Sequence, residues 1–178
     1  MEVTSTVRTD AGLFALWRTS RFSEVAGIDE WEDRVAGDSA LAAVIAEGAL
    51  VPINIGGDGA YEFTVRVVSE LGTLTEREEA FRVVSSQPYL LVSDGMVALG
   101  GLEAVGEDFG APMPEIPLDS GRYAVQIHLI DWKAEPGATD ADGMPTTNAL
   151  ADFVIEMCRV QDDGDLNYCQ SAVTFARD

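Results

Sequence analysis

Short runs in which apolar and polar residues alternate recur along the chain. The clearest run spans Arg122–Trp132, where Tyr123, Val125, Ile127 and Leu129 share one face and polar residues, His128 among them, share the other. A period of two is typical of a β-strand with one buried face. Apolar residues at every second position from Phe153 to Met157 indicate another strand of the same kind.

Turn residues separate these runs and favour hairpins. Asp and Gly tolerate the positive φ angles of tight turns, so an Asp-Gly pair between two alternating runs predicts a hairpin. Four such places occur, at Asp10–Gly12, Gly57–Gly59, Asp94–Gly95 and Asp163–Gly164. The registers that match apolar faces place Val7 opposite Ala15, Ile53 opposite Phe63, Val92 opposite Val97, and Val154 opposite Val173, with Gly59 as a left-handed bulge residue.

Helical patterns are scarce. Ser39–Glu47 has good helix propensity, with Asp38 as the expected N-cap and Gly48 as the C-terminal stop. Asp29 is the expected N-cap of a second short helix. The segment Thr75–Gln87 fits either a helix that begins with a capping box or a strand.

Strands at short intervals predict a mainly β fold, an antiparallel β-sandwich or flattened barrel built from Asp-Gly hairpins, with one or two short helices. No composition shift marks a domain boundary, so residues 1–178 are expected to form a single β-rich domain.

Two cysteines, Cys158 and Cys169, face each other in the fourth predicted hairpin. Opposed strand residues lie about 4.5–5.5 Å apart at Cα, which a disulfide can span. The N-terminus lacks a signal-peptide pattern, however, so we expect a cytoplasmic protein and a reduced thiol pair. A zinc site would need two further ligands, which the neighbouring sequence lacks.

The charge balance narrows the choice of partners. The chain has thirty-one Asp and Glu but only eleven Lys and Arg, which gives a net charge of −20 and a pI near 4.1. Nucleic acid and anionic membrane surfaces attract basic patches, so neither is an expected partner. No run of eighteen apolar residues occurs. The single lysine, Lys133, among ten arginines suggests a bacterium or archaeon with a GC-rich genome or a saline interior.

No residue is predicted to be catalytic, and no cofactor is predicted. Ser39 starts a motif similar to a nucleophile elbow but is better explained by its helix start, and Gly56–Gly59 lacks the lysine of a phosphate loop. His128, the only histidine, is expected to be exposed or partly covered. Asp140 and Asp142 are weak calcium candidates because EF-hand spacing fails around Gly143.

Three functions remain open. The charge favours a non-enzymatic protein-binding module, such as an immunity protein or inhibitor of a basic partner. A structural or accessory subunit, or a secretion chaperone, is the first alternative. The second alternative is an enzyme of unrecognised type that uses His128 and the long loops Ala104–Pro117 and Ala134–Asn148, because long loops without periodicity often carry function. The three tryptophans are expected to pack in the core.

Overall fold

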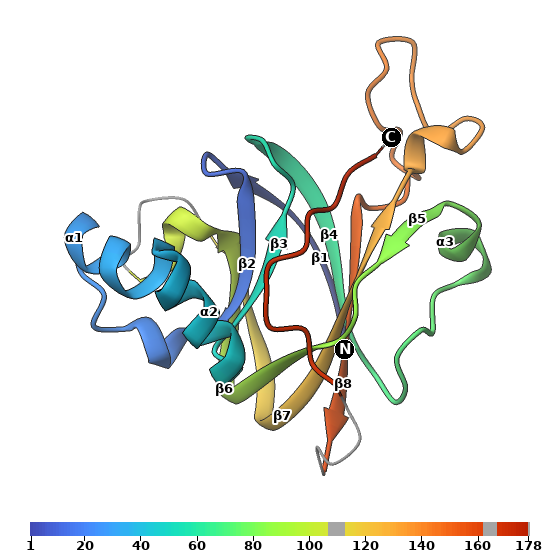
Figure 1. Ribbon diagram of the computed structural model, residues 1–178. Coiled ribbons are helices and arrows are strands. Elements are labelled where there is room, and N and C mark those ends of the chain that lie inside the picture. Colours follow the sequence, from blue (N-terminus) through green and yellow to red (C-terminus); the bar gives the residue numbers. More distant parts are fainter. Residues whose placement is uncertain (107–112, 162–166, 178) are drawn as a thin grey trace.

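The computed structural model describes residues 1–106, 113–161 and 167–177, and it shows one eight-stranded sheet as the body of the molecule (Figure 1). Seven strands follow the order β1-β4-β8-β7-β6-β2-β3, and β5 pairs separately with β7. Every pairing is antiparallel except that of β4 with β8. The strands are β1 (Glu2–Thr9), β2 (Leu13–Arg18), β3 (Leu50–Asn54), β4 (Gly59–Val68), β5 (Arg82–Ser85), β6 (Tyr89–Gly101), β7 (Glu115–Ile130) and β8 (Phe153–Val160).

The sheet folds back on itself. β6 and β7 are 13 and 16 residues long and run through both halves of the sheet. β2 and β4 are not neighbours in the sheet, yet the ring of Phe14 in β2 meets the ring of Phe63 in β4 edge to face, with centroids 5.0 Å apart. The two ends of the sheet therefore enclose one core, and the mainly β class with few short helices is confirmed.

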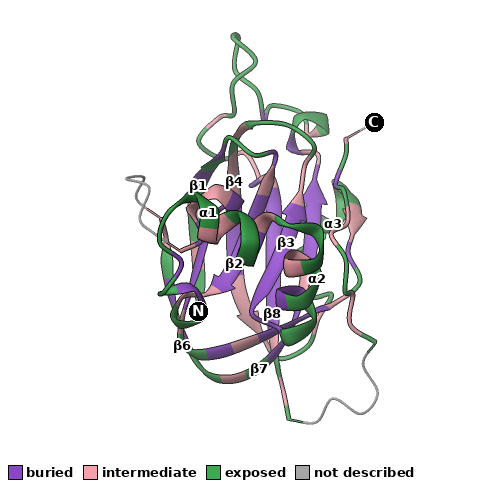
Figure 2. Cartoon of the chain, turned by 60° about the vertical axis from the view of Figure 1, so that its left-hand side comes forward, coloured by how far each residue is buried: buried purple, intermediate pink, exposed green. Residues whose placement is uncertain are grey.

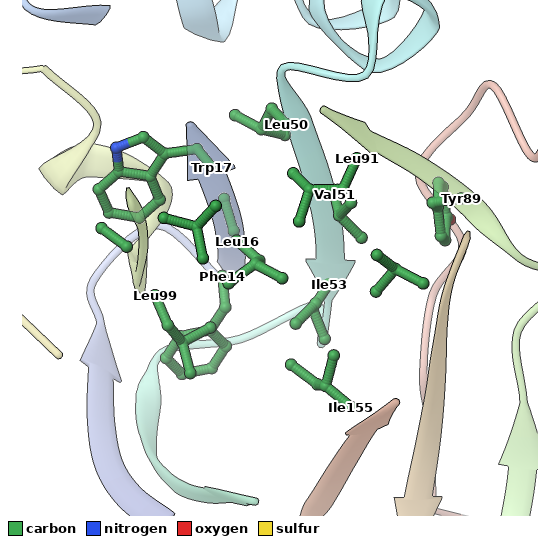
Figure 3. Packing of buried hydrophobic residues seen from close by; sticks show 14 of the residues in the cluster. Phe14, Leu16, Trp17, Leu50, Val51, Ile53, Tyr89, Leu91, Leu99 and Ile155 are labelled. Carbon is green, nitrogen blue, oxygen red and sulfur yellow. The ribbon is translucent and has the colours of Figure 1, made fainter. Parts of the chain in front are cut away.

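Side chains from most strands fill that core. Figure 2 shows the buried residues along the inner strands, and Figure 3 shows Phe14, Ile53 and Ile155 pointing toward one another from three strands. Phe63 stacks on Phe153 of β8 with centroids 5.1 Å apart, and Phe153 meets Phe175 of the C-terminal segment edge to face. Such aromatic pairs stabilise a core beyond the area they bury.

Helices are short and lie outside the sheet. One group follows β2 and projects from one side of the sheet in Figure 1: η1 (Thr19–Phe22), α1 (Ile28–Trp31), the π-helical turn η2 (Glu32–Ala36) and α2 (Asp38–Glu47). The others are α3 (Glu76–Ala80) before β5, and the 3-10 turns η3 (Leu102–Ala104) and η4 (Trp132–Ala134).

The alternation within strands is confirmed, and the predicted hairpins are wrong. Tyr123, Val125, Ile127 and Leu129 are all buried. β1 and β2 are consecutive but do not pair, because β1 pairs with β4 and β2 lies between β6 and β3. β3 and β4 likewise pair with other strands, so Gly57–Gly59 joins two different parts of the sheet. Positive φ occurs there at Gly56, not at Gly59.

The other two predicted hairpins fail for different reasons. β6 continues through Asp94–Gly95, where the single residue Asp94 lies opposite two residues of β7, Asp119 and Ser120, so Val92 and Val97 lie on one strand. β7 likewise begins at Glu115 and continues through Asp119–Gly121. The turn Asp163–Gly164 lies outside the described residues. β8, however, is paired on both sides, by β4 and β7, and has no free edge for residues 167–177.

Helix ends agree in part with the sequence. α2 ends where Gly48 adopts the left-handed conformation, as expected. Asp29 and Asp38 do not cap their helices, because glycines 27 and 37 occupy the N-cap positions. Both interpretations of Thr75–Gln87 hold, since Thr75 forms a full capping box at the start of α3 and the strand β5 follows directly.

Candidate functional site

The acidic helical face, which we define as Asp29, Glu32, Asp33 and Asp38, lies on the helices that project from the sheet. All four side chains are exposed, and Arg34 is the only basic residue between Ser23 and Glu47. Ile28 at the start of α1 is 60% exposed beside them. This face combines concentrated negative charge with an exposed apolar side chain.

Many of the basic side chains form ion pairs with carboxylates of the same chain. Among the described residues, six arginines form ion pairs with carboxylates, and the Arg66 guanidinium holds both oxygens of Glu78. The other five are Arg18 and Arg21 with Glu47, Arg77 with Glu135, Arg82 with Glu79, and Arg177 with Asp152. Arg66 also contacts Glu2, so the six arginines and their six carboxylates have no net charge together. The net charge of −20 is therefore carried by carboxylates that these arginines do not reach.

A groove of about 740 Å³ opens at one end of the folded sheet. It lies between the first residues of β4, the turn η4, the loop 143–150 and the C-terminal Arg177. The sequence singled out Ala134–Asn148 as a long loop without periodicity, and residues 143–147 of that loop form one wall. The volume falls within the range of small-ligand pockets, and the mouths of barrels are common places for them.

Asp152 organises the base of this groove. Its Oδ1 accepts hydrogen bonds from Trp132 Nε1 at 2.8 Å and from an Arg177 terminal nitrogen at 2.7 Å. Its Oδ2 accepts from the backbone N–H of Glu62 at 2.8 Å. Arg177 also donates twice to the carbonyl of Ile130. Since their charges offset each other, Asp152 and Arg177 serve as structural supports.

Two charged groups remain available to a ligand. The ammonium of Lys133 lies 5.4 Å from the ring centre of Trp132, a cation–π contact. Within the part of the chain that the structure describes, neither Lys133 nor the carboxylate of Glu62 forms an ion pair. Tyr61 and Met144, whose side chain is 61% exposed, add aromatic and apolar surface. Sequence reasoning missed this groove because its residues come from five separate segments, Thr6 of β1 among them.

His128 is part of a buried polar series, and the expectation that it is exposed or partly covered is wrong. The residue is 2% exposed, because β5 pairs alongside β7 and residues 72–73 bind the neighbouring carboxylate of Glu156. Nδ1 is 2.7 Å from the hydroxyl of Ser85, and Nε2 is 3.4 Å from Oε2 of Glu156. The Ser85 hydroxyl, the His128 imidazole and the Glu156 carboxylate therefore lie next to one another in a row.

Glu156 is fully buried, and four donors surround it. Its oxygens accept from the backbone N–H groups of Gly72 at 2.6 Å and Thr73 at 3.0 Å, and from the Thr73 hydroxyl at 2.9 Å. Burial by itself raises the pKa of this carboxyl, but the hydrogen bonds from His128, Thr73 and Gly72 outweigh it, so the pKa lies below its ordinary value. These hydrogen bonds thereby hold residues 72–73 against β7 and β8.

Both cysteines are free thiols, and the structure does not place them in a hairpin. Cys158 lies on β8 between Val68 and Ala124, and its sulfur donates to the carbonyl of Ser69. The sulfur of Cys169 donates to the carbonyl of Ser171, and its backbone N–H donates to Pro88.

Asp140 and Asp142 lie in the loop beside the groove. Oδ1 of Asp140 accepts from the backbone N–H groups of Asp142 and Met144, so this carboxylate shapes the turn. No group of three or more His, Cys, Asp or Glu side chains suited to a metal ion occurs within residues 1–106, 113–161 and 167–177. Calcium binding there stays a prediction from the sequence.

Comparisons with known proteins show similarity of fold. No family model matches the chain, and no curated protein matches it in sequence. The solved structure "Crocagin biosynthetic gene J" superposes with a TM-score of 0.60 at 12% identity, over 90% of this chain and 96% of that one. ComJ from Bacillus subtilis, described as an inhibitor of the DNA degrading activity of NucA, gives 0.47 at 10% identity, over 89% and 96%. Likeness at such identities concerns the fold alone.

The helices give no sign of a membrane span. Among those in the described residues, none is both long enough and apolar enough to cross a bilayer.

Proposed function

We propose that this protein is a non-enzymatic binding module whose acidic surface docks on a basic protein, in the manner of an immunity protein or an inhibitor. The observation that carries the proposal is the separation of charge. Six arginines are paired with carboxylates, while the exposed carboxylates of the acidic helical face lie on the same group of helices as Ile28. Complementary charge speeds association and disfavours wrong partners, and a central apolar contact adds affinity.

Charge reversal tests this function. The variant with Asp29, Glu32, Asp33 and Asp38 replaced by Lys is compared with a matched variant in which four exposed acids elsewhere, Asp58, Glu70, Glu76 and Glu115, are replaced by Lys. Both variants change the net charge equally. Any basic partner is isolated by affinity capture from the cell of origin, and its binding to both variants is measured by calorimetry.

The expected result is a basic partner whose affinity falls at least about tenfold between about 50 mM and 500 mM salt, because salt screens exposed charges. The helical-face variant should lose markedly more affinity than the matched variant. Recovery of no basic partner, or equal losses in the two variants, would argue against the proposal.

An enzyme is the second candidate, and the series Ser85–His128–Glu156 favours it. A serine next to an imidazole that a carboxylate orients has the composition of an activated nucleophile. A fluorophosphonate probe, which bonds covalently to activated serine hydroxyls, tests it. Labelling of Ser85 that His128→Gln abolishes would support an enzyme, whereas an unlabelled chain would leave the series with its structural role alone.

A further inference from the structure

The groove at the end of the folded sheet contains an open strand edge. β8 pairs with β4 only from Phe63 onward, where Phe63 faces Phe153. The segment that precedes Phe153 does not pair with β4, and its residues 149–150 form part of the opposite wall of the groove. The first residues of β4 are thus paired with β1 on one side and face the groove on the other.

Two hydrogen bonds show which backbone groups face the groove. Val67 donates its N–H to Met1, on the β1 side, whereas Glu62 donates its N–H to Asp152, on the opposite side. Backbone groups alternate sides along a strand, so the even-numbered residues of β4 point away from β1. The N–H and C=O of Ala60 therefore point into the groove, where no strand among the described residues pairs with them.

Charged side chains flank this edge. The Glu62 carboxylate and the Lys133 ammonium both line the groove without an ion pair in the described chain, whereas Asp152 and Arg177 neutralise each other. A ligand with one basic group can pair with Glu62, and the net charge of −20 attracts such a ligand over longer distances.

We propose that the groove binds an extended basic segment of a partner protein, which adds as a short strand beside Ala60 and places a Lys or Arg side chain against Glu62. This inference rests on the proposed function and names the part of the partner that is recognised. Main-chain hydrogen bonds to an open edge give affinity, and neighbouring pockets select side chains. Tyr61 and Met144 offer apolar contact to the alternate residues of such a segment.

A blocked hexapeptide of alternating valine and lysine is the probe, titrated into ¹⁵N-labelled protein and followed by NMR. We expect the largest shifts at Ala60, Glu62 and Lys133, together with slowed exchange of the Ala60 amide. A peptide of the same sequence with alternate amide nitrogens methylated cannot form the ladder, so it should bind at least about tenfold more weakly. A valine–glutamate peptide should bind at least about tenfold more weakly, because it cannot pair with Glu62 and the net charge of −20 repels it.

Two variants test the contacts directly. Ala60→Pro removes the N–H that faces the groove and leaves the bonds to β1 intact, while Ala60→Val keeps that N–H and serves as the control. Glu62→Gln removes the carboxylate. Binding should fall about tenfold or more in Ala60→Pro and Glu62→Gln and persist in Ala60→Val. Circular dichroism confirms that each variant is folded.

Several outcomes would overturn the inference. Equal binding of the methylated peptide, or shifts confined to the acidic helical face, would mean that charge alone attracts the peptide. Binding of a small aromatic probe such as indole at Tyr61 and Trp132, with no peptide binding, would mark a small-molecule site. If a basic partner binds Ala60→Pro as tightly as the wild type, the proposed function stands and this inference is wrong. If the peptide binds in the groove but no basic partner exists, this inference stands and the proposed function is wrong.

Discussion

Nε2 of His128 lies 3.4 Å from Oε2 of Glu156, so a buried imidazole and a buried carboxylate meet across neighbouring strands. Glu156 is opposite Gln126 in the register of β7 and β8, which makes His128 its diagonal neighbour. Diagonal pairs are within reach of long side chains on one sheet face. The same carboxylate holds Gly72 and Thr73, so one acid joins two strands and the segment above them.

Replacement of Glu156 by Gln should lower the free energy of unfolding near neutral pH by about 1–3 kcal/mol, because an amide cannot accept from all the buried donors. The pKa of Glu156 is lowered in the fold, so its contribution is complete above the pKa of the unfolded state, about 4.3, and is lost as the pH falls through the folded value. Urea unfolding between about pH 3 and pH 7 measures both effects. The wild-type advantage should shrink toward acid, and a constant difference would contradict the prediction. Glu24→Gln, at an exposed position, is the control.

Gly48→Ala should destabilise the protein by more than about 1 kcal/mol. Gly48 ends α2 with a φ of 74°, and an added Cβ would lie 2.7 Å from Cγ of Leu90. Both the left-handed backbone and the contact therefore oppose a side chain. Gly57→Ala is the matched control, because nothing lies within 4 Å of its added Cβ. Thermal unfolding of the two variants should differ clearly, and equal midpoints would be incompatible with this account.

Phe63→Ala should cost about 3–5 kcal/mol, because the ring is fully buried and contacts both Phe14 and Phe153. Its loss leaves a cavity between the two ends of the folded sheet. Val83→Ala, at a side chain that is 41% exposed, should change stability by no more than about 0.5 kcal/mol. Chemical denaturation checks both, and a small effect at Phe63 would mean that the ends of the sheet do not share a core.

Cys158 should alkylate slowly with iodoacetamide at about pH 8. Burial raises the pKa of its thiol, and the nearby carboxylates of Glu70 and Glu156 raise it further, so little reactive thiolate forms. Mass spectrometry of the folded and unfolded chain measures the rate, which should rise on unfolding. Both thiols should also survive mild oxidation without joining each other. An intramolecular bridge between Cys158 and Cys169 would instead support the hairpin predicted from the sequence.

Local patterns in the sequence predicted the strands well and their neighbours poorly. Alternation from Tyr123 to Leu129 identifies a strand because each residue reports its own burial. The Asp-Gly pairs did not decide the topology, because Asp94–Gly95 lies within β6 opposite a bulge of β7, and Gly57–Gly59 links two strands that do not pair with each other. Turn chemistry limits local conformation and leaves open which distant strand becomes the neighbour.

The candidate sites depend on contacts between distant segments, which a single sequence does not encode locally. The alternation in β7 correctly placed His128 on the face opposite the apolar residues. It could not show that this face is buried, because β5 and residues 72–73, which lie over it, are distant in sequence. A glutamate within the apolar run of β8 was the available signal for a buried carboxylate. Lys133 and Glu62 line one groove only because β4, η4 and the loop 143–150 converge.

The position of β8 has a consequence for how the chain matures on the ribosome. Among the strands of the described residues β8 is synthesised last, yet it lies between β4 and β7 in the sheet. Until residues 153–160 emerge, β4 and β7 each present an open edge, and Phe63 lacks its stacking partner Phe153. Nascent chains that stop before Phe153 are therefore exposed to edge-to-edge association, and the sheet is joined across β4 and β7 only after residues 153–160 have been synthesised.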